Sequence, residues 1–224
     1  VTREYYVNDA GRQLVALARS IHYRYRQALD EEVEPIHSDM YPGDYLIPVG
    51  HELARKDGRK WLHADEEGQD GWMEACANFG CEMMLELIRE DLRALGIESN
   101  EPPKYGPGSV TEATDVDPKL LQFRSERKLY LKGRVQEVVD LLKDKGLIYH
   151  GVLEPPKGMK LDDWEPREQW LFAATRFGDD VDRPITTKST LNRRNPELSP
   201  FRDPNLEWTY FPGDIAYHYD KYRR

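Results

Sequence analysis

The sequence predicts an α/β fold for this 224-residue chain. Residues 1–7 are dense in apolar and aromatic side chains, which is typical of a strand. The polar turn Asn8–Gly11 follows, and then comes a helical pattern with apolar residues three and four positions apart. Strand, turn and helix together make half of a βαβ unit. The chain is also rich in aromatic residues, at 11%, which argues against disorder.

Composition narrows the function classes. Lys and Arg number 32 against 41 Asp and Glu, so the net charge is −9 and a surface that coats polyanions is disfavoured. No run approaches the roughly 18 apolar residues that cross a bilayer, so we expect no membrane association. Cys76 and Cys81 are the only cysteines, which points to a reducing cytosol rather than a disulfide framework.

Apolar spacing and breakers predict the remaining elements. The first loop, 30–44, carries six carboxylates and is interpreted as a solvated connector. Helices are expected at 14–29, 72–95, 131–146 and 213–224. Strands are expected at 147–149 with its hairpin partner 170–172, at 185–187 and at 208–211. Loops are expected at 62–70, 101–117 and 189–205.

Self-contained catalytic signatures are absent from the chain. It has no Gly-x-x-x-x-Gly-Lys loop, no Gly-x-Gly-x-x-Gly and no Gly-x-Ser-x-Gly. The six histidines show no paired ligand spacing, and the two cysteines lack the partners for a four-ligand zinc site. We therefore expect no bound metal and a packing role for both cysteines.

Tyr210 and Asp214 are the most suggestive polar residues, because they stand between a predicted strand and a predicted helix. Ligands of open α/β sheets bind beyond the carboxyl ends of strands. An Asp at a helix start can equally be a simple N-cap. Spacing alone leaves both interpretations open.

Several blocks, in order, resemble arginyl-tRNA synthetases, which are class I aminoacyl-tRNA synthetases. They are Val7–Gln13, Tyr41-Pro-Gly-Asp-Tyr45, Arg124-Ser-Glu-Arg127 with Leu129-Tyr130, Phe177–Arg183 and Thr209-Tyr-Phe-Pro-Gly-Asp-Ile-Ala-Tyr-His-Tyr-Asp-Lys221. The resemblance covers essentially the whole chain. It implies a partial Rossmann-like catalytic core interrupted by a mostly helical connective insertion with a small β-hairpin. The implied division is 1–29 for the first core part, 30–184 for the insertion and 185–224 for the return to the core.

The resemblance also implies an activity and its partners. The family activates arginine with ATP, accompanied by Mg²⁺, and transfers it to the acceptor end of tRNA in the cytoplasm. DNA is not an expected partner. Tyr210 and Asp214 match the family's arginine-pocket positions, and a carboxylate is the natural bidentate partner of a guanidinium. Asn8, Asp9 and Gly11 are candidates for the vicinity of the active site, although turn formation explains them equally well. Tyr217 and His218 are candidates too, with structural roles as the alternative.

The chain also departs from the family pattern. The His-Ile-Gly-His-type and Lys-Met-Ser-Lys-Ser-type ATP signatures are absent, so the chain is interpreted as a fragment that would be inactive in isolation. The loop 190–208 is longer than usual, and Pro212 replaces a small residue and is expected to affect the turn between Tyr210 and Asp214. The alternative function is a non-catalytic, synthetase-derived module that keeps the amino-acid pocket.

Overall fold

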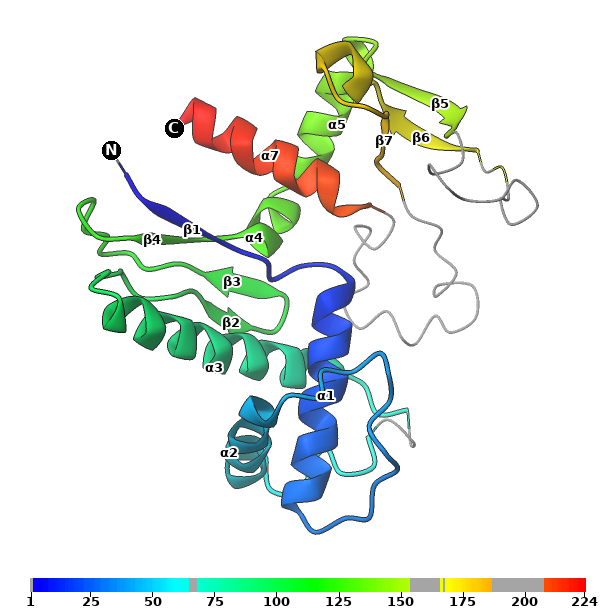
Figure 1. Cartoon of the computed structure of the whole chain (residues 1–224). Coiled ribbons are helices and arrows are strands. Elements are labelled where there is room, and N and C mark those ends of the chain that lie inside the picture. Colours follow the sequence, from blue (N-terminus) through cyan, green and yellow to red (C-terminus); the bar gives the residue numbers. More distant parts are fainter. Residues whose placement is uncertain (1, 65–67, 154–165, 167, 187–207) are drawn as a thin grey trace. The chain divides into compact units, whose positions relative to one another are not determined.

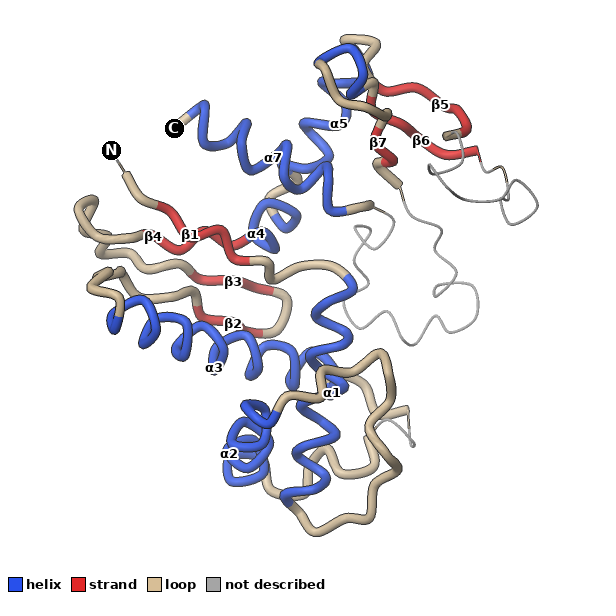
Figure 2. The backbone as a smooth tube through the Cα atoms, in the orientation of Figure 1, coloured by secondary structure: helices blue, strands red, loops and turns tan. Residues whose placement is uncertain are grey.

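The computed structural model describes residues 2–64, 68–153, 166, 168–186 and 208–224 (Figure 1). Contacts divide the chain into two compact units. The described residues of unit 1 lie within Val1–Lys128, and those of unit 2 lie within Leu129–Arg194 and Pro204–Arg224. Helices and short strands alternate along the chain, as Figure 2 shows, which confirms the mixed α/β class.

Unit 1 begins with the strand–turn–helix expected from the sequence. The elements that start within it are β1 (Glu4–Val7), α1 (Arg12–Ala28), η1 (Asp44–Leu46), α2 (Ile47–Asp57), α3 (Trp72–Ala94), β2 (Lys104–Gly106), β3 (Ser109–Thr111), β4 (Gln122–Ser125) and α4 (Glu126–Leu131). Strand β1 pairs in parallel with β4, from Glu4 opposite Gln122 to Val7 opposite Ser125. Parallel pairing requires a long crossover, and here the crossover contains α1, α2 and α3.

The core of unit 1 is made by α1, α2 and α3. Its buried residues include Ala18, Ile21, Tyr25, Leu46, Val49, Leu53, Trp72, Met73, Cys76 and Ala77. A Cβ at Gly50 would lie only 2.5 Å from the backbone of Arg24, so α1 and α2 approach closely because that position has no side chain. The hydroxyl of Tyr25 donates to the carbonyl of Gly58 at 2.5 Å and so holds the end of α2 against α1.

Two expectations for unit 1 need correction. Residues 101–117 are not a plain loop, because β2 and β3 form an antiparallel hairpin there, with Lys104 opposite Thr111. Helix α2 was not expected at all, since its apolar positions follow a turn and are few. The long helix α3, by contrast, runs from Trp72 to Ala94 and confirms the expected 72–95.

Unit 2 contains a small antiparallel sheet and two long helices. Its elements are α5 (Arg134–Asp144), β5 (Ile148–Val152), β6 (Glu168–Phe172), η3 (Ala174–Phe177), β7 (Arg183–Pro184) and α7 (Tyr210–Arg223). The hairpin of β5 and β6 is confirmed, with Tyr149 opposite Leu171, and β7 adds a third strand beside β6. Apolar side chains of α5, the sheet and α7 share one core, which includes Val139, Ile148 and Ile185.

Two further expectations in or near unit 2 need correction. The helix expected over 131–146 begins later, because α4 ends at Leu131 and α5 begins after Gly133. The strand expected at 208–211 is absent. Trp208 makes only an isolated bridge with Thr186, and α7 already begins at Tyr210.

The expected loop at 189–205 lies outside the described residues, and so does most of the segment 190–208. The division into 1–29, 30–184 and 185–224 differs from the two compact units, since β4 pairs with β1 although it belongs to the segment 30–184. That division concerns the catalytic core of a whole synthetase. It stays a prediction, as does the Rossmann-like character of the core.

Candidate functional site

Helix α7 carries four of the predicted site residues, and its start is held by Thr209. The Thr209 backbone is extended, and its hydroxyl oxygen accepts from the backbone N–H of Phe211 at 3.4 Å. The same hydroxyl donates to the carbonyl of Pro184 at 2.7 Å. The backbone N–H of Thr209 donates to the carbonyl of Ile185 at 3.0 Å. The β7 segment therefore fixes where α7 begins.

This start changes the meaning of Asp214. It lies in the second turn of α7 and is not an N-cap, because Thr209 occupies that position. The capping interpretation of Asp214 is therefore wrong. Tyr210, Asp214 and His218 follow at intervals of four residues, which places them on one face of the helix.

The predicted site residues of α7 differ in their exposure to solvent. Tyr210 is 69% exposed and His218 is exposed, whereas Tyr217 is 7% exposed. Burial raises the pKa of Asp214, and nearby His218 acts in the opposite direction. A partly desolvated carboxylate between a phenol and an imidazole suits a cationic ligand with hydrogen-bond donors.

Tyr217 and Pro212 have structural surroundings. The ring of Tyr217 is buried, and the ammonium of Lys221 lies 5.7 Å from its centroid. Pro212 is buried in the first turn of α7, where the helix requires no N–H from it. The expectation that Pro212 affects a turn between Tyr210 and Asp214 is wrong, because both lie within the helix.

A second cluster forms in unit 1 at the carboxyl ends of the parallel strands β1 and β4. Asp9, which is 1% exposed, accepts three hydrogen bonds there. The hydroxyls of Tyr105 and Ser125 donate to its Oδ2 at 2.5 and 2.6 Å. The backbone N–H of Arg127 donates to its Oδ1 at 2.8 Å. The blocks around Asp9 and around Ser125 thus meet although they lie far apart in the sequence.

Burial dominates the electrostatics of this cluster. It raises the pKa of Asp9 despite the three donors and the nearby guanidinium of Arg127. It also raises the pKa of the Cys81 thiol to about 12, with the charge of Asp9 adding to the effect. The pKa of Tyr105 is raised for the same two reasons. Cys81 and Tyr105 therefore remain protonated at neutral pH, and Cys81 is no nucleophile.

Arg127 extends the cluster to helix α3. Its guanidinium donates to Oδ1 of Asn78 at 2.7 Å and to Oε1 of Glu74 at 3.3 Å. Glu74 Oε1 also accepts from the backbone N–H of Gly108, in the turn of the β2–β3 hairpin, at 2.8 Å. Neither Glu74 nor Asn78 was singled out in the sequence, where the only signal was the Ser-Glu-Arg block directly after β4.

Asn8 and Gly11 have local roles beside Asp9. The side-chain amide of Asn8 donates to Oε1 of Gln13 at 2.7 Å. Gly11 precedes α1 with φ of +76°, a conformation that side-chain-bearing residues rarely adopt. Asn8, Asp9 and Gln13 also line a cavity of about 200 Å³ between α1 and α3.

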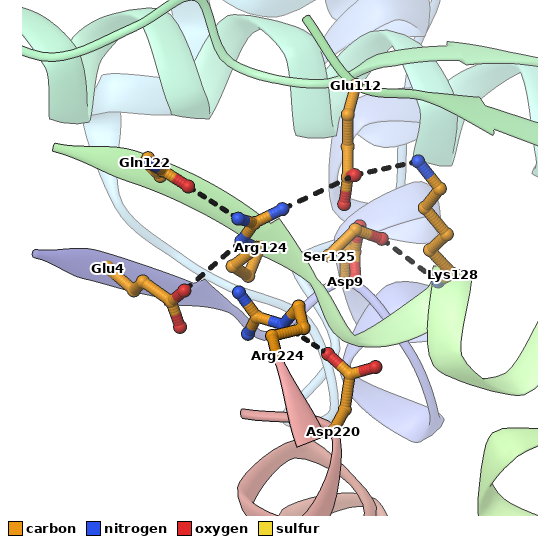
Figure 3. A network of polar contacts seen from close by, with 9 residues as sticks. All are labelled: Glu4, Asp9, Glu112, Gln122, Arg124, Ser125, Lys128, Asp220 and Arg224. Carbon is orange, nitrogen blue, oxygen red and sulfur yellow. Dashed lines mark hydrogen bonds and ion pairs between the residues drawn. The ribbon is translucent and has the colours of Figure 1, made fainter. Parts of the chain in front are cut away.

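Figure 3 shows a further polar network along β4. The Arg124 guanidinium lies 3.4 Å from Glu4, whose side chain is only 3% exposed, and 3.8 Å from Glu112. Glu112 also pairs with the ammonium of Lys128 at 2.7 Å. These contacts link the start of β1, the chain after β3 and helix α4 along strand β4.

Within the described residues, no group of three or more His, Cys, Asp or Glu side chains is placed to hold a metal ion. Cys76 is fully buried in the core of unit 1, in agreement with its expected packing role. None of the helices in this part of the chain is long and apolar enough to cross a bilayer.

Comparison with known proteins gives a consistent result. Arginine–tRNA ligases of Cereibacter sphaeroides, Roseobacter denitrificans and Paracoccus denitrificans are 45%, 44% and 43% identical to the chain. Each alignment covers the whole chain and 32% of the relative. No protein-family profile matches.

A solved structure shares the fold. It is described as an arginyl-tRNA synthetase from Campylobacter jejuni, with a TM-score of 0.62 over 99% of this chain and 36% of that one, at 23% identity. The chain spans about a third of the length of the curated relatives that it matches. Over its whole length, the chain is homologous to part of the arginine–tRNA ligases.

Proposed function

We propose that this chain serves as part of an arginine–tRNA ligase, which activates arginine with ATP and transfers it to the acceptor end of tRNA. The observation that carries the proposal is the 45% identity to such ligases over the entire chain. At this identity over all 224 residues, a shared activity is the simplest interpretation. A cytoplasmic location, where translation takes place, is part of the proposal.

The proposed arginine site is the face of α7 formed by Tyr210, Asp214 and His218. Asp214 is assigned to accept the guanidinium in a bidentate pair, which a substrate lysine cannot reproduce. Tyr210 is assigned to offer its ring face and hydroxyl from the exposed first turn. Support comes from their common helix face and from the partial burial of Asp214, which strengthens its attraction for a cation.

The proposed role of the Asp9 cluster is positioning. Asp9, Ser125 and Arg127 join the ends of two parallel strands, the edge at which α/β proteins bind ligands. Asn8 lies next to them and faces solvent, so it is the proposed contact residue of this edge. ATP supplies the activating phosphates and Mg²⁺ accompanies it. The two ATP signatures of the family are absent from these 224 residues, so no residue of this chain is assigned to the phosphates or to Mg²⁺.

The test is arginylation by the whole protein that contains this chain. We expect arginine-dependent ATP–pyrophosphate exchange and charging of tRNA with arginine, with no exchange above background for lysine. A folded protein that binds arginine, seen by calorimetry, but supports neither exchange nor charging would instead establish the non-catalytic binding module.

A further inference from the structure

One side of α1 bears a stripe that the proposed arginine site does not use. Arg19, His22, Tyr23 and Arg26 follow at intervals of three and four residues, so they share one helix face. The neighbouring face of α1, with Ala18, Ile21 and Tyr25, is buried in the core, and His22 at its border is buried too. The stripe combines basic and aromatic side chains.

This stripe forms one wall of a cavity of about 450 Å³, within the size range of small-molecule sites. The remaining lining comes from the segment His37–Met40 and from Trp72 at the start of α3. The ring of Trp72 packs 4.6 Å from the ring of His22, whose Nε2 lies 2.6 Å from the carbonyl oxygen of Trp61. The aromatic part of the lining is therefore held in place.

The charge of the cavity is opposite to that of the chain. Two guanidiniums and one carboxylate, Asp39, line it, whereas the whole chain has a net charge of −9. Asp39 lies against Arg19 at 2.8 Å and against His37 at 2.6 Å. Burial opposes ionisation of Asp39, but its hydrogen bond to His37 and the charge of Arg19 outweigh that effect, so the pKa of Asp39 is lowered. The carboxylate of Asp39 therefore already pairs with Arg19, one of the two arginines that line the cavity.

We propose that this cavity binds a nucleoside phosphate, with the phosphate at Arg19 and Arg26 and the base against Tyr23 and Trp72. Guanidiniums bind phosphate through paired donors, and aromatic rings stack on any base. Asp39 holds Arg19 in place until the phosphate replaces it. Free nucleotides and single nucleotides of an RNA strand share this chemistry. The proposal deepens the proposed function, because tRNA is the RNA that such a protein would meet.

The test compares matched arginine variants of the whole protein. A fluorescent short oligoribonucleotide and AMP are the two probes, and binding is followed by anisotropy and by calorimetry. Arg19→Gln should weaken binding about three- to tenfold. Arg55→Gln is the control, because Arg55 forms a similar 2.8 Å ion pair with Glu52 on α2, outside the cavity. The difference between the two variants isolates the cavity from other nucleotide sites.

The salt dependence of binding and an Asp39 variant provide two further tests. For a strand with one phosphate held by both arginines, this contact should contribute a slope of about −0.7 to the fall of log affinity with log salt, and Arg19→Gln should make the slope shallower. Asp39→Asn should tighten binding about threefold, because the internal competitor is removed. An ion pair that merely holds the segment 37–40 predicts weaker binding for both variants, and that result would overturn the proposal.

The two probes separate the sources of the ligand. Tighter binding of the oligonucleotide than of AMP, with both sensitive to Arg19→Gln, assigns the site to an RNA strand. Equal affinities assign it to a free nucleotide. Equal losses for Arg19→Gln and Arg55→Gln, with unchanged thermal unfolding of both variants, would reject the site. None of these results depends on arginine activation, so they stand apart from the test of the proposed function.

Discussion

At the scale of single residues, Asp214 is the side chain whose interpretation changes most between sequence and structure. A capping Asp would tolerate replacement by Asn, since both residues cap helices well. Thr209 takes the capping role, so that explanation for Asp214 is removed. What remains is a partly buried carboxylate on the face that also bears Tyr210 and His218.

Asp214→Asn in the whole protein should raise the Michaelis constant for arginine about ten- to a hundredfold. Asn offers no charge and one acceptor to the guanidinium, and hydrogen bonds to charged groups contribute roughly 1.5–3 kcal/mol. Tyr210→Phe should have a smaller effect, because the ring face survives. Asp220→Asn, which breaks a partly exposed ion pair with Arg224 at the end of the same helix, is the control. Near-normal arginine dependence of Asp214→Asn in pyrophosphate exchange would refute the assignment.

The pH dependence of arginine binding should also report on Asp214. Burial raises its pKa, so on acidification it loses its charge at a higher pH than an ordinary Asp does. The guanidinium stays charged throughout. The Michaelis constant for arginine should therefore rise as the pH falls through that raised pKa. The Michaelis constant for ATP is the internal reference. If the Michaelis constant of Asp214→Asn for arginine rises at acidic pH in the same way as that of the wild type, another group is responsible for the titration.

At the scale of elements, the Asp9 cluster joins β1, β2, β4, α3 and α4. Asp9 follows β1, Tyr105 belongs to β2, and Ser125 ends β4. Arg127, at the start of α4, reaches α3 through Asn78. Because the cluster is buried, each of its donors and acceptors requires a partner, and removal of one leaves the others unsatisfied.

Asp9→Asn should lower the free energy of unfolding by about 1–3 kcal/mol at neutral pH, because the amide replaces one acceptor oxygen by a donor. The pH dependence has a definite sign. Burial raises the pKa of Asp9 in the folded protein above its pKa in the unfolded chain, which is near 4. Protonated Asp9 therefore contributes its full stabilisation below the unfolded pKa, and this stabilisation is lost as the pH rises through the folded pKa. Urea unfolding of both proteins across this range should show that decline only in the wild type.

The exposed Asp144, at the end of α5, provides the matched control for this substitution. Asp144→Asn should leave both the stability and its pH dependence within about 0.5 kcal/mol of the wild type. An Asp9→Asn protein that unfolds like the control would contradict a structural role for the cluster.

At the scale of the whole molecule, the chain covers 32% of the relatives that it matches, and it lacks the two phosphate-handling signatures. Activation of an amino acid depends on electrostatic stabilisation of the transferring phosphoryl group. We therefore expect the isolated 224-residue chain to form no arginyl-adenylate. Arginine-dependent pyrophosphate exchange is the assay, with the whole protein as the positive control. Exchange above background by the purified chain, abolished by Asp214→Asn, would overturn this expectation.

The sequence by itself determined the features that depend on local pattern. The sequence predicts helices α1 and α3, because side chains three or four positions apart share a helix face whatever surrounds them. It also predicts the β5–β6 hairpin and the ordered motif blocks. Locally ambiguous segments were misjudged. The aromatic run Trp208–Phe211 has strand-like composition, and the better signal was Thr209 followed by Pro212 in a first helical turn.

Only the tertiary structure decided which distant residues meet. Ser125 reaches Asp9 across 116 positions, since the parallel register of β1 and β4 brings both strand ends to one edge. The acidic segment 30–44 is expected to be solvated, but Asp39 forms an ion pair with Arg19 and Glu31 forms one with Arg59. Burial, and with it the raised pKa of Asp9, arises from the packing of α3 and the β2–β3 hairpin around that edge. The local sequence does not predict such packing, because packing depends on segments that are distant in the chain and meet only in the fold.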